Sequence, residues 1–295
     1  MKTLVMLIKR NMIIYRRNKS AVFFSLLSMI IIIGLNLVFL GKINVDELVE
    51  MSGTSKDNAE YLINSWLMAG VIVVNSVTVS LGVIGIMIED EEKKRILSYW
   101  VAPVSRGKLT LGYILASFFM SCIMCFITFA VSEGYIVLCG GTLLNSVDMI
   151  KAVLYIILNV FSSACFMFFI VMFIHTSGAF TGLSSIVGTL VGFIGGIYIP
   201  MGAFPELVQK IVKCFPLVYG ASAMRGVLSR DALDLAFENA KPSIISEYSS
   251  YMGISLSWND NILSDWIKIL VLMASGFLFM ILSMFILKRK QIRDR

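Results

Sequence analysis

Charged residues are scarce in this chain, and their scarcity excludes an ordinary soluble protein. Charged side chains make up 15% of the 295 residues, hydrophobic ones make up 58%, and the mean hydropathy is +0.85. Soluble domains contain about 25% charged residues, because water has to wet their surface. With so few charged side chains, the chain is expected to lie in a membrane rather than in water.

Residues that build catalytic and metal sites are also scarce. His175 is the single histidine and has no carboxylates clustered with it, so we expect no bound metal. Cys122 and Cys125 form a C-x-x-C pair inside an apolar stretch, where packing is expected rather than redox chemistry. The phosphate-binding pattern G-x-x-x-x-G-K-[ST] is absent, so we expect no nucleotide site and no enzyme.

Uncharged sequence, in contrast, is abundant. Six stretches of 19 to 30 residues contain no Asp, Glu, Lys, Arg or His, and a helix needs about 20 apolar residues to cross a bilayer. Because the apolarity is continuous, it predicts helices rather than the alternating strands of a barrel, and the expected fold is an all-α polytopic membrane protein. Its six transmembrane helices are predicted at residues 20–41, 64–88, 109–138, 150–174, 179–199 and 267–287.

Basic residues are unevenly distributed along the chain. Residues 1–20, 89–108 and 288–295 hold sixteen of the 25 Lys and Arg residues. Cytoplasmic segments of membrane proteins carry such an excess, so both termini, including the tail at 288–295, and the loop at 89–108 are predicted to be cytoplasmic. A basic groove with interleaved aromatic residues is absent, so no nucleic acid is expected as a partner.

Residues 1–19 are predicted to form an amphipathic interfacial helix. Its apolar residues share one helical face, and most of its Lys and Arg residues lie elsewhere. A helix of this kind can lie in the headgroup boundary of the inner leaflet while its cations meet anionic lipid. The residues of the apolar face are Leu4, Leu7, Ile8, Met12 and Tyr15. A disordered basic leader is the alternative.

The loop at residues 89–108 has a graded composition. It begins with acidic residues, continues with basic and then apolar ones, and reaches Pro103. Acidic residues favour the first turn of a helix, and the residue before a proline is pushed out of the α region. We therefore predict a short amphipathic cytoplasmic helix that starts near Glu89, with a solvated loop as the alternative.

Prolines interrupt the semi-apolar segment that follows the fifth predicted span. Pro200, Pro205 and Pro216 lie close together there. Broken helices are tolerated at membrane depth only where they are buried in protein or face water. We therefore predict that residues 200–266 are external and contain a re-entrant hairpin between the fifth and sixth spans.

Small and polar residues inside the spans are candidates for helix packing or for lining a pathway. Membrane helices associate through small residues spaced by four and through side chains that form hydrogen bonds, so both interpretations stay open. The positions are Asn36, Asn75, Gly188, Gly192 and Gly196. Glu133 is the acidic residue within an apolar segment, and it is either functional or reaches to the interface.

Three segments, of which the amphipathic leader at residues 1–19 is the least specific, together resemble the ABC-2 type transporter permease family, the membrane subunits of bacterial exporters. The first is residues 89–109, EDEEKKRILSYWVAPVSRGKL, similar to the family's short helix between the second and third spans. The second is residues 204–225, FPELVQKIVKCFPLVYGASAMR, similar to its two-proline segment after the fifth span. Lys94, Arg95 and Ser222 differ from the residues that the family commonly has at these positions. These differences bear on the geometry of coupling to the ATPase and on the substrate subclass.

The resemblance implies a transport subunit that uses ATP through a partner. Two copies of a separate cytoplasmic ATPase, which bind ATP and Mg, would act on two permease chains, identical or homologous, in the bacterial plasma membrane. This chain would bind no cofactor itself. The residues implied in ATPase coupling are Glu89, Glu92, Ile96, Leu97, Tyr99, Trp100, Pro103 and Arg106. Those implied in an external gate are Pro205, Pro216, Tyr219 and Arg225.

ATP-driven export of a hydrophobic or amphipathic compound is the leading expectation, such as a drug, an antimicrobial peptide or a lipid-like molecule. A polysaccharide or glycolipid exporter of the same family is the alternative. Such a pathway would favour aromatic residues, and the spans at 64–88 and 179–199 have few. An ATP-independent sensor or scaffold fits the composition but not the two similar segments.

Overall fold

Helices form nearly all of the chain, which confirms the all-α prediction. The computed structural model describes residues 2–35, 41–95, 98–99, 104–238, 240–258 and 261–293. Within these ranges the exception is a small antiparallel hairpin, in which Ser257 pairs with Ile262 and Trp258 pairs with Asn261.

The element boundaries follow from capping as well as from apolarity. Ser55, Asn145 and Thr176 each accept a hydrogen bond from a backbone N–H three residues later, which starts a long helix. The helices are α1 Lys2–Arg17, α2 Lys19–Leu35, α3 Gly41–Ser52, α4 Lys56–Glu92, α6 Arg106–Leu138, α7 Ser146–Val171, α8 Ser177–Ile194, η2 Met201–Ala203, α9 Glu206–Val212, α10 Pro216–Leu228, α11 Arg230–Ala236, α12 Pro242–Tyr251 and α13 Asp265–Arg293. The strands are β1 Ser257–Trp258 and β2 Asn261–Ile262.

Several of these helices can cross a membrane. In the described part of the chain, five are long and apolar enough on their own: Lys56–Glu92, Gly107–Leu138, Ser146–Val171, Ser177–Ile194 and Asp265–Ile286. Two further pairs pass the same test only together, and each is bent, α1 with α2 by 77° and α9 with α10 by 93°. The six predicted spans fall within this range of five to seven, and the bent α9–α10 pair has the form predicted for a re-entrant segment.

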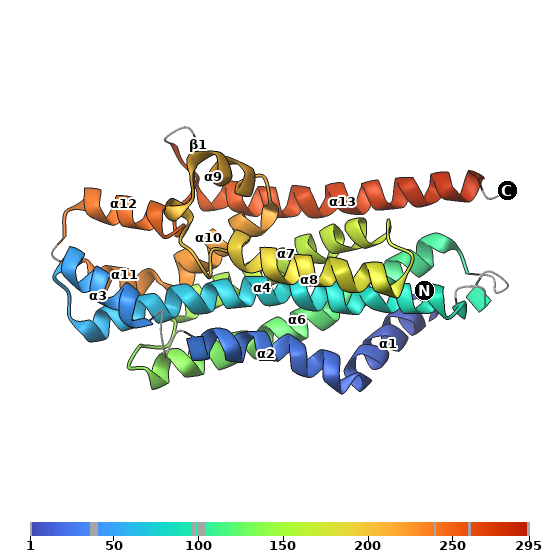
Figure 1. Ribbon diagram of the computed structural model, residues 1–295, viewed down its shortest axis with the longest axis horizontal. Coiled ribbons are helices and arrows are strands. Elements are labelled where there is room, and N and C mark those ends of the chain that lie inside the picture. Colours follow the sequence, from blue (N-terminus) through green and yellow to red (C-terminus); the bar gives the residue numbers. More distant parts are fainter. Residues whose placement is uncertain are drawn as a thin grey trace.

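Helix α4 lies at the centre of the bundle (Figure 1) and contacts α2, α6, α7, α8 and α10. It is apolar around its whole circumference, which is the pattern of a helix surrounded by protein. In its most apolar window 83% of the residues are buried, and Leu62, Met68 and Ile84 are fully so. The other helices are therefore held in place largely through α4.

Helices α8 and α13 lie at the periphery. Only 17% of the residues in the most apolar window of each are buried. Large apolar side chains such as Ile186, Leu278 and Ile281 are more than half exposed. In a membrane protein such side chains face lipid or another membrane chain.

The chain termini share one end of the molecule. Figure 1 shows both ends of the described chain near the end of α4, at the far side from α3, α11 and α12. We call this the terminal end of the bundle and the opposite one the distal end. That both termini are cytoplasmic stays a prediction.

The structure differs from the expected boundaries at three places. The acidic residues from Glu89 to Glu92 form the last turns of α4, so the prediction that they begin a separate helix is wrong. Helix α4 also starts earlier than the predicted span at 64–88. The span expected at 179–199 ends as a helix at Ile194, where the chain bends through Gly195 and Gly196.

Candidate functional site

A buried carboxylate, Asp90, joins three helices at the terminal end of the bundle. Its side chain is 0% exposed. Arg10 of α1 donates two hydrogen bonds to it, at 2.5 and 2.7 Å, and Tyr113 of α6 donates a third at 2.7 Å. Arg95, which follows α4, lies 3.4 Å from the same carboxylate. We call these four residues the Asp90 junction.

Burial makes this junction depend on its cations. An isolated carboxylate costs several kcal/mol to remove from water, and only charged partners with good geometry offset that cost. The acids also lie at the C-terminal, negative end of α4, where the helix dipole opposes them. Arg10 and Arg95 therefore allow α4 to continue through Asp90, and they fix α1 and the following loop to its end.

Helix α1 packs against protein along one face. Leu7, Asn11 and Tyr15 are buried, and a Cβ at Gly112 of α6 would lie only 2.9 Å from the Cβ of Leu7. On another side, Val5 is 61% exposed and can reach the headgroup boundary. The predicted apolar face therefore packs against the bundle, since none of its five residues is exposed, and Val5 lies outside it.

The predicted coupling residues lie around this junction where the structure describes them. Glu89 forms an ion pair with Lys93 at 3.0 Å, and Glu92 accepts a hydrogen bond from Ser177 at the start of α8. The guanidinium of Arg10 lies 5.7 Å from the centre of the Tyr99 ring. The remaining positions, Ile96, Leu97, Trp100, Pro103 and the side chain of Arg106, lie outside the described residues.

The segment after α4 and helix α1 enclose a cavity of about 500 Å³. Arg10 and Met6 of α1 lie on one side, and Arg95 and Tyr99 lie on the other. The cavity opens at the terminal end, so a second protein can reach a surface that combines cations, an aromatic ring and a methionine.

At the distal end, Arg225 of α10 is 2% exposed and ties the end of α8 to its neighbours. Its Nη2 donates to the carbonyl oxygens of Gly195 at 2.7 Å and Gly196 at 2.8 Å, and Nη1 donates to that of Met252 at 3.4 Å. The guanidinium also lies 4.4 Å from the centre of the Trp66 ring of α4. Carbonyls at a helix C-terminus carry partial negative charge, so they stabilise this cation in place of a carboxylate.

Gly196 is required for this arrangement. Its φ of +66° favours glycine, and a Cβ there would lie 3.0 Å from Nη1 of Arg225. We call Arg225, Gly195, Gly196, Met252 and Trp66 the Arg225 cluster. From the sequence, Arg225 was predicted as a gate residue and Gly196 as a packing or pathway residue. The fold brings the two into contact.

The two prolines of the predicted gate start the two helices of the bent pair. Pro205 precedes the first residue of α9, and Pro216 is the first residue of α10. Proline is favoured at such starts because it needs no partner for a backbone N–H. Tyr219 is partly buried on α10, where Val218 packs on Met201 and Leu256 of the distal end.

Polar side chains inside the bundle connect α4 to its neighbours. Asn75 donates to Thr128 of α6 at 2.6 Å, and Asn159 of α7 donates to Ser76 at 2.7 Å. Such bonds hold membrane helices together. Asn36 lies outside the described residues, and Glu133 accepts a hydrogen bond from the backbone N–H of Leu144 at 3.2 Å, at one end of α6.

Helix α8 carries a face of small residues that the chain itself leaves open. In the described structure, a Cβ at Gly188 would have no heavy atom within 4 Å, whereas one at Gly192 would overlap Tyr198. The hydroxyl groups on this face donate hydrogen bonds to backbone carbonyls one turn earlier in α8. A second helix packed closely on this face would therefore leave none of these hydroxyl groups without a partner. We call this face the α8 stripe, and it consists of Gly178, Thr181, Gly182, Ser185, Gly188 and Thr189.

Comparison with known proteins gives the family. No curated protein and no solved structure matches the chain. A family model described as "ABC-2 family transporter protein" matches residues 42–285, which include α4, α6, α7, α8 and most of α13, together with the Asp90 carboxylate and the Arg225 cluster. Among the described residues, no group of three His, Cys, Asp or Glu could hold a metal ion. Because the match covers most of the sequence, the chain belongs to the ABC-2 transporter family, as a membrane permease without a nucleotide-binding site of its own.

Proposed function

We propose that this permease exports a hydrophobic or amphipathic compound, driven by a separate ATPase that binds at the terminal end of the bundle. The observation that carries the proposal is the place where the predicted coupling segment, residues 89–108, begins. This segment starts at the Asp90 junction, where one carboxylate contacts α1, α4 and α6 together. A partner that moves the segment therefore acts on three helices at once.

The ATPase surface would include the cavity between α1 and the segment after α4. Protein contacts usually combine aromatic or methionine side chains with arginine and a polar rim. Tyr99, Arg95 and Met6 line this cavity, and Met6 is 65% exposed. Leu97 and Trp100, which lie in the same segment, would supply further anchors.

A second permease chain, identical or homologous, would pack on the α8 stripe. Small residues at a spacing of three or four let two membrane helices approach closely. The stripe is exposed in the single chain although it lies on a helix of membrane-spanning length. The substrate route would then run between the two chains along α8.

The external gate would be the Arg225 cluster with the α9–α10 bend. Outward opening has to separate the end of α8 from α10, and the bonds from Arg225 to Gly195 and Gly196 oppose that separation. Ile186, an exposed apolar residue beside the α8 stripe, favours a hydrophobic or amphipathic substrate over a sugar chain.

A reconstituted complex tests the coupling role. The permease is purified with the ATPase that accompanies it in its host, and ATP hydrolysis is measured in vesicles. The double variant Leu97→Ala and Trp100→Ala should lose the stimulation of hydrolysis while remaining inserted. Leu278→Ala on α13, a residue that is 54% exposed, is the matched control and should keep it. Unchanged stimulation in the double variant would contradict the proposed coupling surface.

A further inference from the structure

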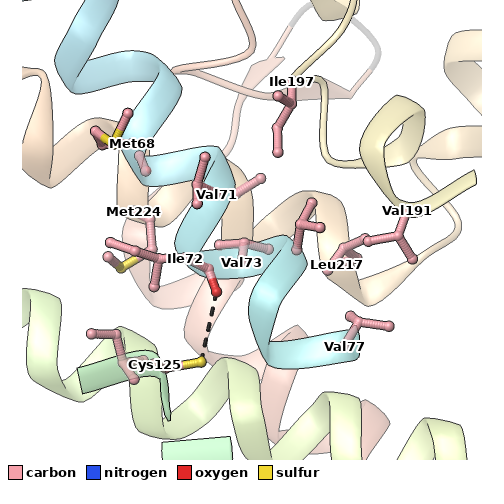
Figure 2. Close-up of a cluster of buried hydrophobic side chains, with 14 of the residues drawn as sticks. Met68, Val71, Ile72, Val73, Val77, Cys125, Val191, Ile197, Leu217 and Met224 are labelled. Atoms are coloured by element: carbon pink, nitrogen blue, oxygen red, sulfur yellow. Dashed lines mark hydrogen bonds between the residues drawn. The ribbon is translucent and has the colours of Figure 1, made fainter. Parts of the chain in front are cut away.

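An apolar cavity of about 160 Å³ lies between α7, α8 and the bend that joins α9 to α10. Figure 2 shows Val77 of α4, Val191 of α8 and Leu217 of α10 on one side of the buried cluster, and all three line the cavity. Phe166 and Met167 of α7 form the opposite wall. The Arg225 cluster does not include this cavity.

The lining offers nothing for water to bind. Its two hydroxyl side chains already have partners, since Ser162 is 2.9 Å from Ser275 and Ser163 is 3.1 Å from Ser76. The other lining side chains are hydrocarbon or thioether. A cavity of about 150 Å³ lined by such groups stays dry and takes up a benzene-sized apolar molecule. The ligand that fits here is therefore a hydrocarbon segment of roughly six carbons.

The surroundings identify the source of that hydrocarbon. Helices α7 and α8 both have membrane-spanning length and composition. Leu190 lines the cavity and is also 49% exposed, so the wall of the cavity continues into the outer surface of α8. At bilayer depth that surface is bathed by the acyl chains of phospholipids.

We propose that this cavity is a binding site for the end of one phospholipid acyl chain. The chain enters beside Leu190 and inserts its terminal carbons between α7, α8 and the Phe215–Leu217 bend. The inference rests on the membrane location of the chain and not on its transport substrate.

An acyl chain in this site would set the distance between α8 and α7. Five residues separate Ser185 on the α8 stripe from Leu190, which at about 100° per residue places them on nearly opposite sides of the helix. An acyl chain in the cavity therefore props α8 away from α7 and toward whatever packs on the stripe. The permease would in this way require a lipid to hold α8 in position.

Photo-cross-linking of the full chain tests the site. The permease is reconstituted in vesicles of phosphatidylcholine that carries a diazirine near the end of one acyl chain, irradiated, digested and analysed by mass spectrometry. Met167 is 2% exposed but lines the cavity, so lipid at the outer surface cannot label it. We expect adducts on Met167 and Phe166 as well as on Leu278 and Ile281, which face outward on α13.

Two variants on α8 separate the cavity from the outer surface. Val187→Phe fills the cavity and should abolish the Met167 adducts while leaving those on α13 unchanged. Ile186→Phe makes a similar change at the neighbouring residue, which is 59% exposed and does not line the cavity, and should leave all adducts in place. If Val187→Phe does not fold, Leu190→Phe at the mouth replaces it. The proposal is overturned if wild-type Met167 stays unlabelled while α13 is labelled, or if the filled variant is labelled as strongly as wild type.

Discussion

Replacing Arg10 with methionine should destabilise the folded chain, because it leaves the Asp90 carboxylate buried without its main cation. Removing one partner of a buried ion pair costs about 3–5 kcal/mol. Arg10 is 27% exposed and Arg95 lies 3.4 Å from the same carboxylate, so part of the charge stays compensated. We therefore expect a loss of about 3 kcal/mol in the free energy of unfolding, at the low end of that range.

The reverse change is expected to be milder. Asp90→Leu leaves Arg10 without its carboxylate, but a partly exposed guanidinium can turn toward water, so we expect a loss of about 2 kcal/mol. The double variant, Arg10→Met with Asp90→Leu, removes both charges together. Its free energy of unfolding should fall by only about 2 kcal/mol, mostly because the Tyr113 hydroxyl is left without an acceptor. The coupling free energy between the two positions is then about 3 kcal/mol.

Denaturant titration of the purified permease in mixed micelles measures these differences. Lys93→Ala is the matched control, since Lys93 and Glu89 form an exposed pair, 53% and 47% accessible, and such pairs contribute less than about 1 kcal/mol. If the losses of the two single variants simply add in the double variant, Arg10 does not neutralise Asp90 and the reasoning about the junction is refuted.

Three further predictions concern the distal end and α8. Gly220→Ala puts a Cβ against Oδ1 of Asn159 and should cost about 1–3 kcal/mol, whereas Gly226→Ala on the same helix meets no described atom and should leave the free energy of unfolding unchanged or raise it. Arg225→Lys keeps the cation but cannot reach several carbonyls at once, so a loss of about 1.5–3 kcal/mol is expected in the same titration, and wild-type stability would argue against the Arg225 cluster as a restraint. Gly188→Leu should leave the single chain folded and weaken association with a second permease chain, measured by cross-linking in vesicles; undiminished cross-linking would exclude the α8 stripe as the contact.

The spans could be predicted because uncharged runs report directly on burial in lipid. Ending each helix at the first charged residue places the end of α4 too early, because Glu89 and Asp90 still belong to this helix. The helix continues because Arg10, 80 positions away in the sequence, neutralises Asp90. A contact over that separation has no local signal, so neither Arg10 nor Tyr113 was identified as a functional candidate.

The distal end was predicted in part. The similarity of residues 204–225 to a family segment identified Arg225, and the prolines indicated the broken helices, of which α9 precedes Arg225 and α10 contains it. What Arg225 binds could not be predicted, because its partners are backbone carbonyls of Gly195, Gly196 and Met252. Any residue has such a carbonyl, and these three come together only because the bend at the end of α8 and the end of α12 meet at Arg225.

The length of α4 has a mechanical consequence. Its 37 residues make a rod of about 55 Å, nearly twice the roughly 30 Å of the hydrocarbon core. Asp90 lies near one end of this rod, and Trp66 of the Arg225 cluster lies about 12 Å to the other side of its middle, so one rigid helix carries both. A tilt of roughly 5° about its middle moves Asp90 by about 2 Å and Trp66 by about 1 Å, and a shift of about 1 Å is enough to lengthen a hydrogen bond beyond its normal range. A force applied at Asp90 at the terminal end can thus loosen the contacts of Arg225 at the distal end through the helix itself.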